Sequence, residues 1–96
     1  MRREVRVTDR FFDRLDDLLS SERSVDGDPS TADFLLHEMP RVIERLASGF
    51  EEVTIPAAPG SDVRVLITVG VFGRILGIYV ALAAGGWVEV IDLDID

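Results

Sequence analysis

The sequence predicts an α+β fold in which two N-terminal helices pack on one face of an antiparallel sheet, in the order β-α-α-β-β-β. Two patterns support this prediction. In the first half of the chain apolar residues recur every three or four positions, whereas the second half shows β-branched residues, strand-like alternation and glycine-rich breaks. Helices grouped before hairpins are typical of α+β domains. The length of 96 residues suits one domain, which we expect to span residues 1–96.

Local signals mark the first strand and the first helix. Val5 and Val7 alternate with charged residues in a short β-like run. Thr8 then offers a hydroxyl that can cap the N-terminus of a helix. This helix should end near Ser21, where a stretch rich in turn-forming residues begins. Its apolar stripe consists of Phe11, Phe12, Leu15, Leu18 and Leu19.

The second helix is predicted to begin at Ser30 and to reach Gly49. Ser30 and Asp33 have the spacing of a capping box. Pro40 interrupts the helix, because it lacks the N–H that would bond the carbonyl of Leu36. We expect one bent helix, with two short helices that meet near residues 37–39 as the alternative. The apolar stripe consists of Phe34, Leu35, Met39, Val42, Ile43, Leu46 and Phe50.

A short extended piece at residues 53–55 and a proline-containing loop lead to the longest apolar tract, residues 63–86. The tract is long enough to span a membrane, but Arg74 at its middle would cost about 3 kcal/mol there. Alternation along residues 63–69 instead favours two strands that join near a pair of glycines. We therefore expect strands and no membrane contact. The second strand, residues 74–83, is apolar on both sides and should lie inside the sheet.

A turn at residues 83–86 precedes the last strand. In that strand Leu93 and Ile95 alternate with aspartates, whereas Val88 and Val90 are out of phase with them. Either a β-bulge near Val90 resets the alternation, or both faces are partly covered at that end.

Composition limits the partners and the location. The net charge of −8 repels polyanions, so a nucleic acid is not an expected partner. The N-terminal arginines alternate with acidic residues, which is typical of a solvated surface whose charges pair with one another. The chain has no cysteine, which excludes disulfides and thiolate metal sites. Its first residues also lack the apolar segment of a secretory signal. We expect a cytoplasmic protein.

The order of these blocks resembles the RelE/ParE family of small bacterial toxins. The resemblance rests on an opening "EVRVT", on helices containing "DRFFDRLDDLL" and "VIERLASGF", and on strands at "VRVLITV", "GRILGIYV" and "VEVIDLDID". It implies a toxin that an antitoxin neutralises. RelE-like members cleave messenger RNA on the ribosome, and ParE-like members inhibit DNA gyrase. In that family two strands of the meander begin with an arginine, and Arg64 and Arg74 stand at those positions.

The C-terminus departs from the pattern of the ribonucleases in this family. Those members use several basic residues to hold phosphate, often with an aromatic general acid or base near the C-terminus. This chain ends in "DLDID", contains no lysine, and carries Tyr79 inside an apolar strand. We therefore assign no catalytic residue, no metal and no cofactor, and we expect contact with a partner rather than catalysis.

Three residues are candidates for partner binding: Arg64, Arg74 and Trp87. Arg74 opens an apolar strand, so it either pairs with Glu89 or with an aspartate across the sheet, or it faces a partner or ligand. Trp87 follows a glycine-rich turn, where its ring either caps the core or forms part of an exposed apolar patch.

Two further groups are interpreted as structural. His37 has no neighbour suited to catalysis or metal binding, so we expect a structural or exposed histidine. The aspartates at 92, 94 and 96 share one side of the last strand. They could hold a cation loosely, but a solvated strand face that resists pairing with another chain is the preferred interpretation.

Three functions follow from these observations. The first is a toxin-like protein that acts by binding an antitoxin-like protein or a cellular target. The second is a non-catalytic domain that forms a homodimer through its apolar sheet, residues 63–91. The third, placed last, is a nuclease of the family type.

Overall fold

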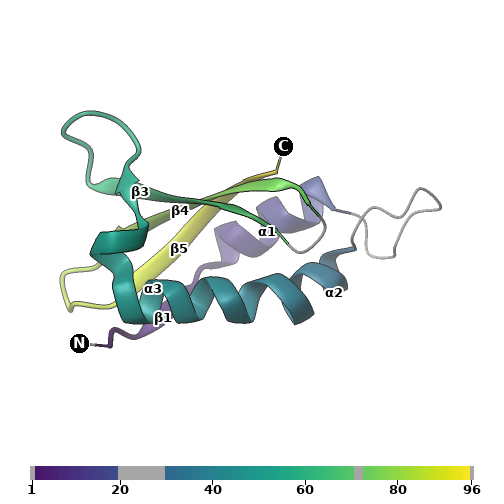
Figure 1. Ribbon diagram of the computed structural model, residues 1–96, viewed down its shortest axis with the longest axis horizontal. Coiled ribbons are helices and arrows are strands. Elements are labelled where there is room, and N and C mark those ends of the chain that lie inside the picture. The colour runs from purple at the N-terminus through teal and green to yellow at the C-terminus, as the bar shows by residue number, and fades with distance from the viewer. Residues whose placement is uncertain (1, 20–29, 71–72, 96) are drawn as a thin grey trace.

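Five strands form one sheet, and helices cover one of its faces (Figure 1). The computed structural model describes residues 2–19, 30–70 and 73–95. This arrangement confirms the predicted α+β fold and its order of elements. The elements are β1 (Val5–Val7), α1 (Asp9–Leu18), α2 (Thr31–Asp33), the π-helical turn η1 (Phe34–Glu38), α3 (Met39–Val53), β2 (Ile55–Pro56), β3 (Val63–Val69), β4 (Ile75–Leu82) and β5 (Val88–Ile95).

The strand order is β1-β5-β4-β3-β2. Strands β3, β4 and β5 form the predicted antiparallel meander, and the short β2 extends it beyond β3. β1 pairs with β5 in parallel, so the sheet is mixed rather than wholly antiparallel. The parallel pairing is sterically possible because the connection between the two strands is long: it contains the helices and also strands β2, β3 and β4.

The long apolar tract is not a membrane helix. It forms β3 and β4 with the turn that follows β4, and β4 lies between two other strands as predicted. In the part of the chain that the structure describes, no helix has the length and apolar character needed to cross a bilayer.

Helix α1 begins as the sequence predicts. The backbone N–H of Phe11 donates to the hydroxyl of Thr8 at 3.4 Å, which caps the helix. The helix ends at Leu18, slightly before the predicted end, and Ser21 itself lies outside the described residues. Phe11 and Leu15 are buried, but Phe12 is 40% exposed and is not part of the buried stripe. One step along a helix turns the side chain by about 100°, which carries Phe12 away from the sheet.

The second helical segment accommodates Pro40 by forming a π-helical turn just before it. Ser30 and Asp33 form the predicted capping box. The N–H of Met39 then donates to the carbonyl of Phe34, five residues earlier, and Pro40 lies in the first turn of α3, where a missing N–H leaves no bond broken. The predicted irregularity is therefore a π-helical turn.

The predicted helix end at Gly49 coincides with a kink in α3. Gly49 has non-helical angles, φ −151° and ψ 43°, but the helix continues beyond it to Val53. Just after the kink, the centre of the Phe50 ring lies 5.8 Å from the guanidinium of Arg64 on β3.

One core holds the two layers together. Side chains from α1, η1 and α3 pack against the inner sides of β3, β4 and β5. Val80 lies opposite Val90, whereas Tyr79 lies opposite Asp92, so β5 contains one extra residue at Ile91. This bulge confirms the predicted irregularity near Val90 and turns both Val90 and Leu93 inward. The completely buried sheet residues are Leu66, Ile78, Val80, Val88, Val90 and Leu93.

Candidate functional site

Arg64 points toward the helices and joins β3 to the end of α3. Its Nε donates to the hydroxyl of Thr54 at 2.7 Å, and its Nη2 donates to the carbonyl of Thr54, also at 2.7 Å. Its guanidinium lies 5.8 Å from the centre of the Phe50 ring. These contacts give Arg64 a structural task on the covered side of the sheet.

Arg74 and Trp87 lie at opposite ends of β4. Arg74 is exposed just before the strand, and its carbonyl accepts a hydrogen bond from the N–H of Gly70 at 2.8 Å. A pairing of Arg74 with Glu89 is excluded, because Glu89 lies opposite Ala81 at the far end of the strand. The structure therefore does not bring the three candidate residues Arg64, Arg74 and Trp87 together.

Trp87 is half-buried among polar groups rather than in the core. The guanidinium of Arg6 lies over its ring, 3.9 Å from the ring centre, and its Nε1 donates to Glu89 at 3.1 Å. The ring also rests on Gly85, where a Cβ would approach it to 2.1 Å. Trp87 is thus held by its neighbours, and neither of the two predicted roles describes it fully.

The remaining predicted groups are on the surface or paired. His37 is exposed on the π-helical turn, in agreement with its interpretation. Arg14 donates to Asp94 at 3.1 Å, and Arg10 donates to Asp92 at 3.4 Å, so α1 supplies partners for these two aspartates, whereas Asp96 lies outside the described residues. Within residues 2–19, 30–70 and 73–95 no cluster of three or more histidine or acidic side chains is placed to hold a metal ion.

The sheet face opposite the helices is the candidate functional surface, here named the open face. The register of the strands gives its members, since residues directly opposite one another share a side of the sheet. Its apolar half, on β2, β3 and β4, consists of Ile55, Val63, Val65, Ile67, Val69, Ile75, Gly77, Tyr79 and Ala81. Its charged border, on β5 and β1, consists of Arg6, Glu89, Asp92 and Asp94.

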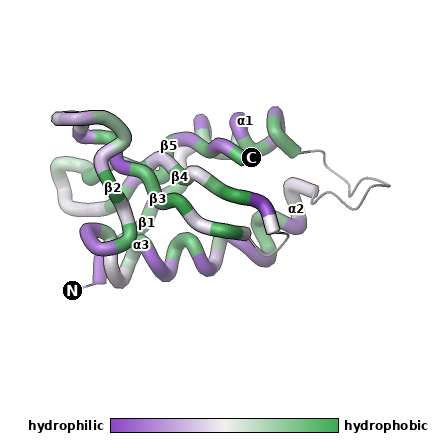
Figure 2. Tube along the Cα trace, turned by 45° about the horizontal axis from the view of Figure 1, so that its top comes forward, coloured by the Kyte–Doolittle hydropathy of each residue, from purple (hydrophilic) through white to green (hydrophobic). Residues whose placement is uncertain are grey.

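The side of β3 that faces away from the helices is more apolar than the side that faces them. Four aliphatic residues point to the open face, whereas Arg64, Leu66 and Thr68 point to the helices. Ile67 and Val69 are 58% and 62% exposed, and Ile55 and Ile75 are about half exposed. Figure 2 shows the green, hydrophobic stretches of β3 and β4. Contiguous exposed apolar surface of this kind marks an interaction site on many proteins.

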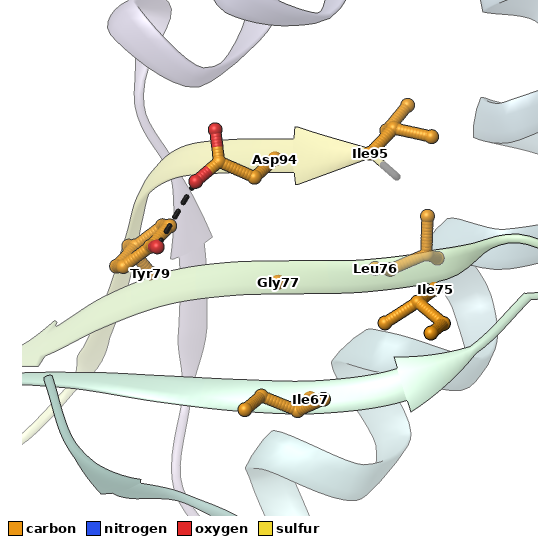
Figure 3. A pocket seen from close by; sticks show the side chains of 7 residues that line it. All are labelled: Ile67, Ile75, Leu76, Gly77, Tyr79, Asp94 and Ile95. Atoms are coloured by element: carbon orange, nitrogen blue, oxygen red, sulfur yellow. Dashed lines mark hydrogen bonds between the residues drawn. The ribbon is translucent and has the colours of Figure 1, made fainter.

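A hollow of about 390 Å³ lies in the open face over Gly77 (Figure 3). Ile67 and Ile75 border it on one side, and Tyr79 and Asp94 border it on the other. The hydroxyl of Tyr79 donates to Asp94 at 3.0 Å. This hydrogen bond and the negative charge of Asp94 raise the pKa of Tyr79, because both disfavour the phenolate. The hollow therefore combines aliphatic side chains with one carboxylate.

The sequence predicts an apolar sheet over residues 63–91 as a self-association surface, but it does not predict which side of that sheet is exposed. The signal was present in the alternation of residues 63–69, which separates Val63, Val65, Ile67 and Val69 from the rest. The alternation does not tell which side the helices cover, because both sides of β3 carry apolar residues.

Comparison with protein-family models, with curated proteins and with solved structures found no match for this chain. The α+β architecture with helices on a five-strand mixed sheet is the part of the RelE/ParE resemblance that the structure bears out.

Proposed function

We propose that this chain is a non-catalytic protein-binding domain, a toxin-like protein of the RelE/ParE kind that binds an antitoxin-like protein or a cellular target through the open face. One observation carries the proposal: the more apolar side of β3 faces outward, and the side with Arg64 and Thr68 faces the helices. Burying that outward surface against a partner would gain about 25 cal/mol for each Å² of apolar area removed from water.

The order of blocks supports the toxin-like part of the proposal. The chain combines an opening strand, two helical segments and a meander, as the resemblance implies. The acidic end of β5 does not favour the ribonuclease chemistry of RelE-like members, because carboxylates there would repel the phosphates of a messenger RNA. Binding without catalysis is therefore the form of the function that we propose.

Expression of the chain in a bacterial host tests this function. We expect growth to slow, and we expect co-expression of the product of the adjacent reading frame to restore it through a stable complex. Ile67→Glu should abolish both the slowing of growth and the formation of the complex, because it places a charge in the apolar half of the open face. Leu36→Glu is the matched control, since Leu36 is 70% exposed on the π-helical turn, away from the open face.

Unimpaired growth together with no complex would count against the toxin-like proposal. Ribosome-dependent cleavage of messenger RNA that disappears in Arg74→Ala would instead establish an enzyme.

Self-association is the second candidate, and the same exposed aliphatic residues favour it. A second copy could cover the apolar half, although two copies at −8 each repel one another. Sedimentation equilibrium decides: a strict monomer at high micromolar concentration removes this candidate.

A further inference from the structure

We propose that the open face binds a cationic amphipathic helix of a partner protein, with an aliphatic side chain of that helix in the hollow over Gly77 and its Arg or Lys side chains beside Asp94. This inference rests on the proposed binding function and deepens it by naming the chemistry of the partner. Its basis is the combination of an apolar floor, a carboxylate at the edge of that floor, and the charge of the whole chain.

The floor of the hollow is shaped by a missing side chain. Gly77 lies between Ile67 on β3 and Asp94 on β5. Its φ is not positive, so the backbone there does not require glycine. A Cβ at this position would lie 3.8 Å from Val65 and 3.9 Å from Tyr79 and Asp94, which are ordinary contact distances. The hollow is therefore open space above a regular strand and can accept a side chain from outside.

The border of the hollow selects a positive charge. Asp94 remains 59% exposed although Arg14 and Tyr79 both donate to it. The apolar half carries no basic side chain among the described residues, and Arg6 at the far edge stacks on Trp87 and pairs with Glu4. With a net charge of −8, the chain favours a basic partner over a second copy of itself.

The dimensions favour a helix as the occupant. Neighbouring strands lie about 4.8 Å apart, whereas a helix with its side chains is about 10–12 Å across. One helix therefore covers β3 and β4 and reaches the acidic residues of β5. Apolar residues at helical spacing would face Ile67, Ile75 and the hollow, and basic residues along one side would face Asp94.

Two labelled synthetic peptides provide the test. Both carry a leucine stripe at positions i, i+3, i+4 and i+7; one has Arg along the flanks of the stripe, and its twin has Glu at the same positions. Fluorescence anisotropy with the full chain measures both affinities. We expect the Arg peptide to bind at least about tenfold more tightly than the Glu peptide, with a difference that shrinks as salt is added. Equal binding of the two peptides would overturn the proposal.

Variants of the chain locate the contact. Gly77→Val places a side chain in the hollow, and its Cβ meets only ordinary contact distances, so the fold should keep its thermal stability while the Arg peptide loses at least about tenfold in affinity. Asp94→Asn should weaken binding of the Arg peptide several-fold and should not weaken binding of the Glu peptide, because it removes a repulsion from the Glu side chains. Leu36→Ala, away from the open face, should change neither. Undiminished binding of the Arg peptide to Gly77→Val would overturn the assignment of the hollow.

The two proposals can fail separately. If Ile67→Glu abolishes the growth effect but neither peptide binds, the open face still binds a partner, but that partner is not a cationic helix. If sedimentation shows a dimer that Gly77→Val dissociates, a second copy is the occupant and the cationic-helix inference is wrong. If the Arg peptide binds at the hollow and the chain has no effect on growth, the cationic-helix inference is supported and the toxin-like function is contradicted.

Discussion

Arg64 and Thr54 form a small hydrogen-bonded unit between the end of α3 and the start of β3. The hydroxyl of Thr54 accepts from Arg64 and donates to the carbonyl of Phe50 at 2.6 Å. Thr54 is buried, so its hydroxyl has little water to replace these bonds. This unit explains why a charged residue is tolerated on the covered side of the sheet: its donors are matched there.

Thr54→Val should destabilise the domain by about 1–3 kcal/mol, because it keeps the shape but leaves the Nε of Arg64 without its acceptor. Thr68→Val is the matched control. Thr68 accepts from Arg45 at 2.9 Å in an exposed pair, and its loss should cost less than about 0.5 kcal/mol. Urea denaturation measures both. Equal effects of the two substitutions would show that the Arg64 bonds add nothing beyond a surface contact.

Titration of the Tyr79 hydroxyl tests the hydrogen bond to Asp94 on the open face. It is the only tyrosine in the chain, so tyrosinate absorbance follows it alone. Its pKa is raised above 10.0 by the hydrogen bond to Asp94 and by the nearby negative charges. Asp94→Asn should lower this pKa toward its ordinary value, and Asp92→Asn should lower it less. An unchanged titration in Asp94→Asn would mean that the hydrogen bond does not persist in solution.

The sign of the corresponding stability effect follows from linkage. A raised pKa means that the folded chain holds the phenolic proton more tightly than the unfolded chain does. The stabilisation from Tyr79 is therefore complete below pH 10 and is lost as the pH rises through the raised pKa. Asp94→Asn should flatten this alkaline decline, which denaturation at a series of alkaline pH values would measure.

Strand β5 has an edge that is left partly open, as does β3 beyond its short pairing with β2. β1 pairs only with Val88–Val90, and no strand in the described part of the chain continues that pairing toward Ile95. Helix α1 compensates, since Arg14 donates from its Nε to the carbonyl of Leu93 at 3.0 Å and from its Nη2 to Asp94. The helix thus satisfies a backbone group that a strand would otherwise satisfy.

Arg14→Met should cost about 0.5–1.5 kcal/mol of stability, because it removes the donor to the Leu93 carbonyl while keeping a long side chain. Arg10→Met is the matched control on the same helix. Its pair with Asp92, at 3.4 Å, is exposed and should contribute about 0–1 kcal/mol. Thermal unfolding of the two variants compares them. A larger loss in Arg10→Met than in Arg14→Met would contradict this account of the β5 edge.

The elements that could be predicted from the sequence are those with local causes. Thr8 and the pair of Ser30 with Asp33 lie next to the helix starts that they cap, and the bulge near Val90 shows as a break in alternation. The helix beyond Gly49 and the parallel pairing of β1 with β5 could not be predicted in this way. Both depend on contacts between residues far apart in the chain, for which a single sequence contains no direct signal.

The candidate surface, too, has one feature that the local sequence predicts and one that depends on distant contacts. The alternation along residues 63–69 predicts two different sides of β3, but the choice of the covered side depends on where α1 and α3 pack. The sequence predicts Arg64 as a partner-binding residue, yet its guanidinium donates hydrogen bonds to Thr54 at the C-terminal end of α3. In the sequence, a charged side chain at the start of a strand is equally compatible with binding to another protein and with a hydrogen bond to an acceptor on the covered side of the sheet.

The whole molecule consists of one helical layer and one sheet, and the sheet has two unlike sides. The covered side contributes fully buried residues to the core, whereas the open face leaves aliphatic residues in water. A fold of two layers normally turns its most apolar side inward. On β3 alone the more apolar side faces outward, and this is the observation behind our proposal that another chain covers the open face.

Two neighbouring residues on β3 test this two-sided description of the molecule. Leu66 is completely buried beneath the helices, and Ile67 is 58% exposed on the open face. Leu66→Ala should cost about 2–5 kcal/mol in the isolated chain, whereas Ile67→Ala should change stability by less than about 0.5 kcal/mol. Chemical denaturation at low protein concentration measures both, and the concentration dependence of the midpoint adds a control. A large, concentration-dependent cost for Ile67→Ala would show that the open face is already covered by a second copy, and a small cost for Leu66→Ala would contradict the placement of the core.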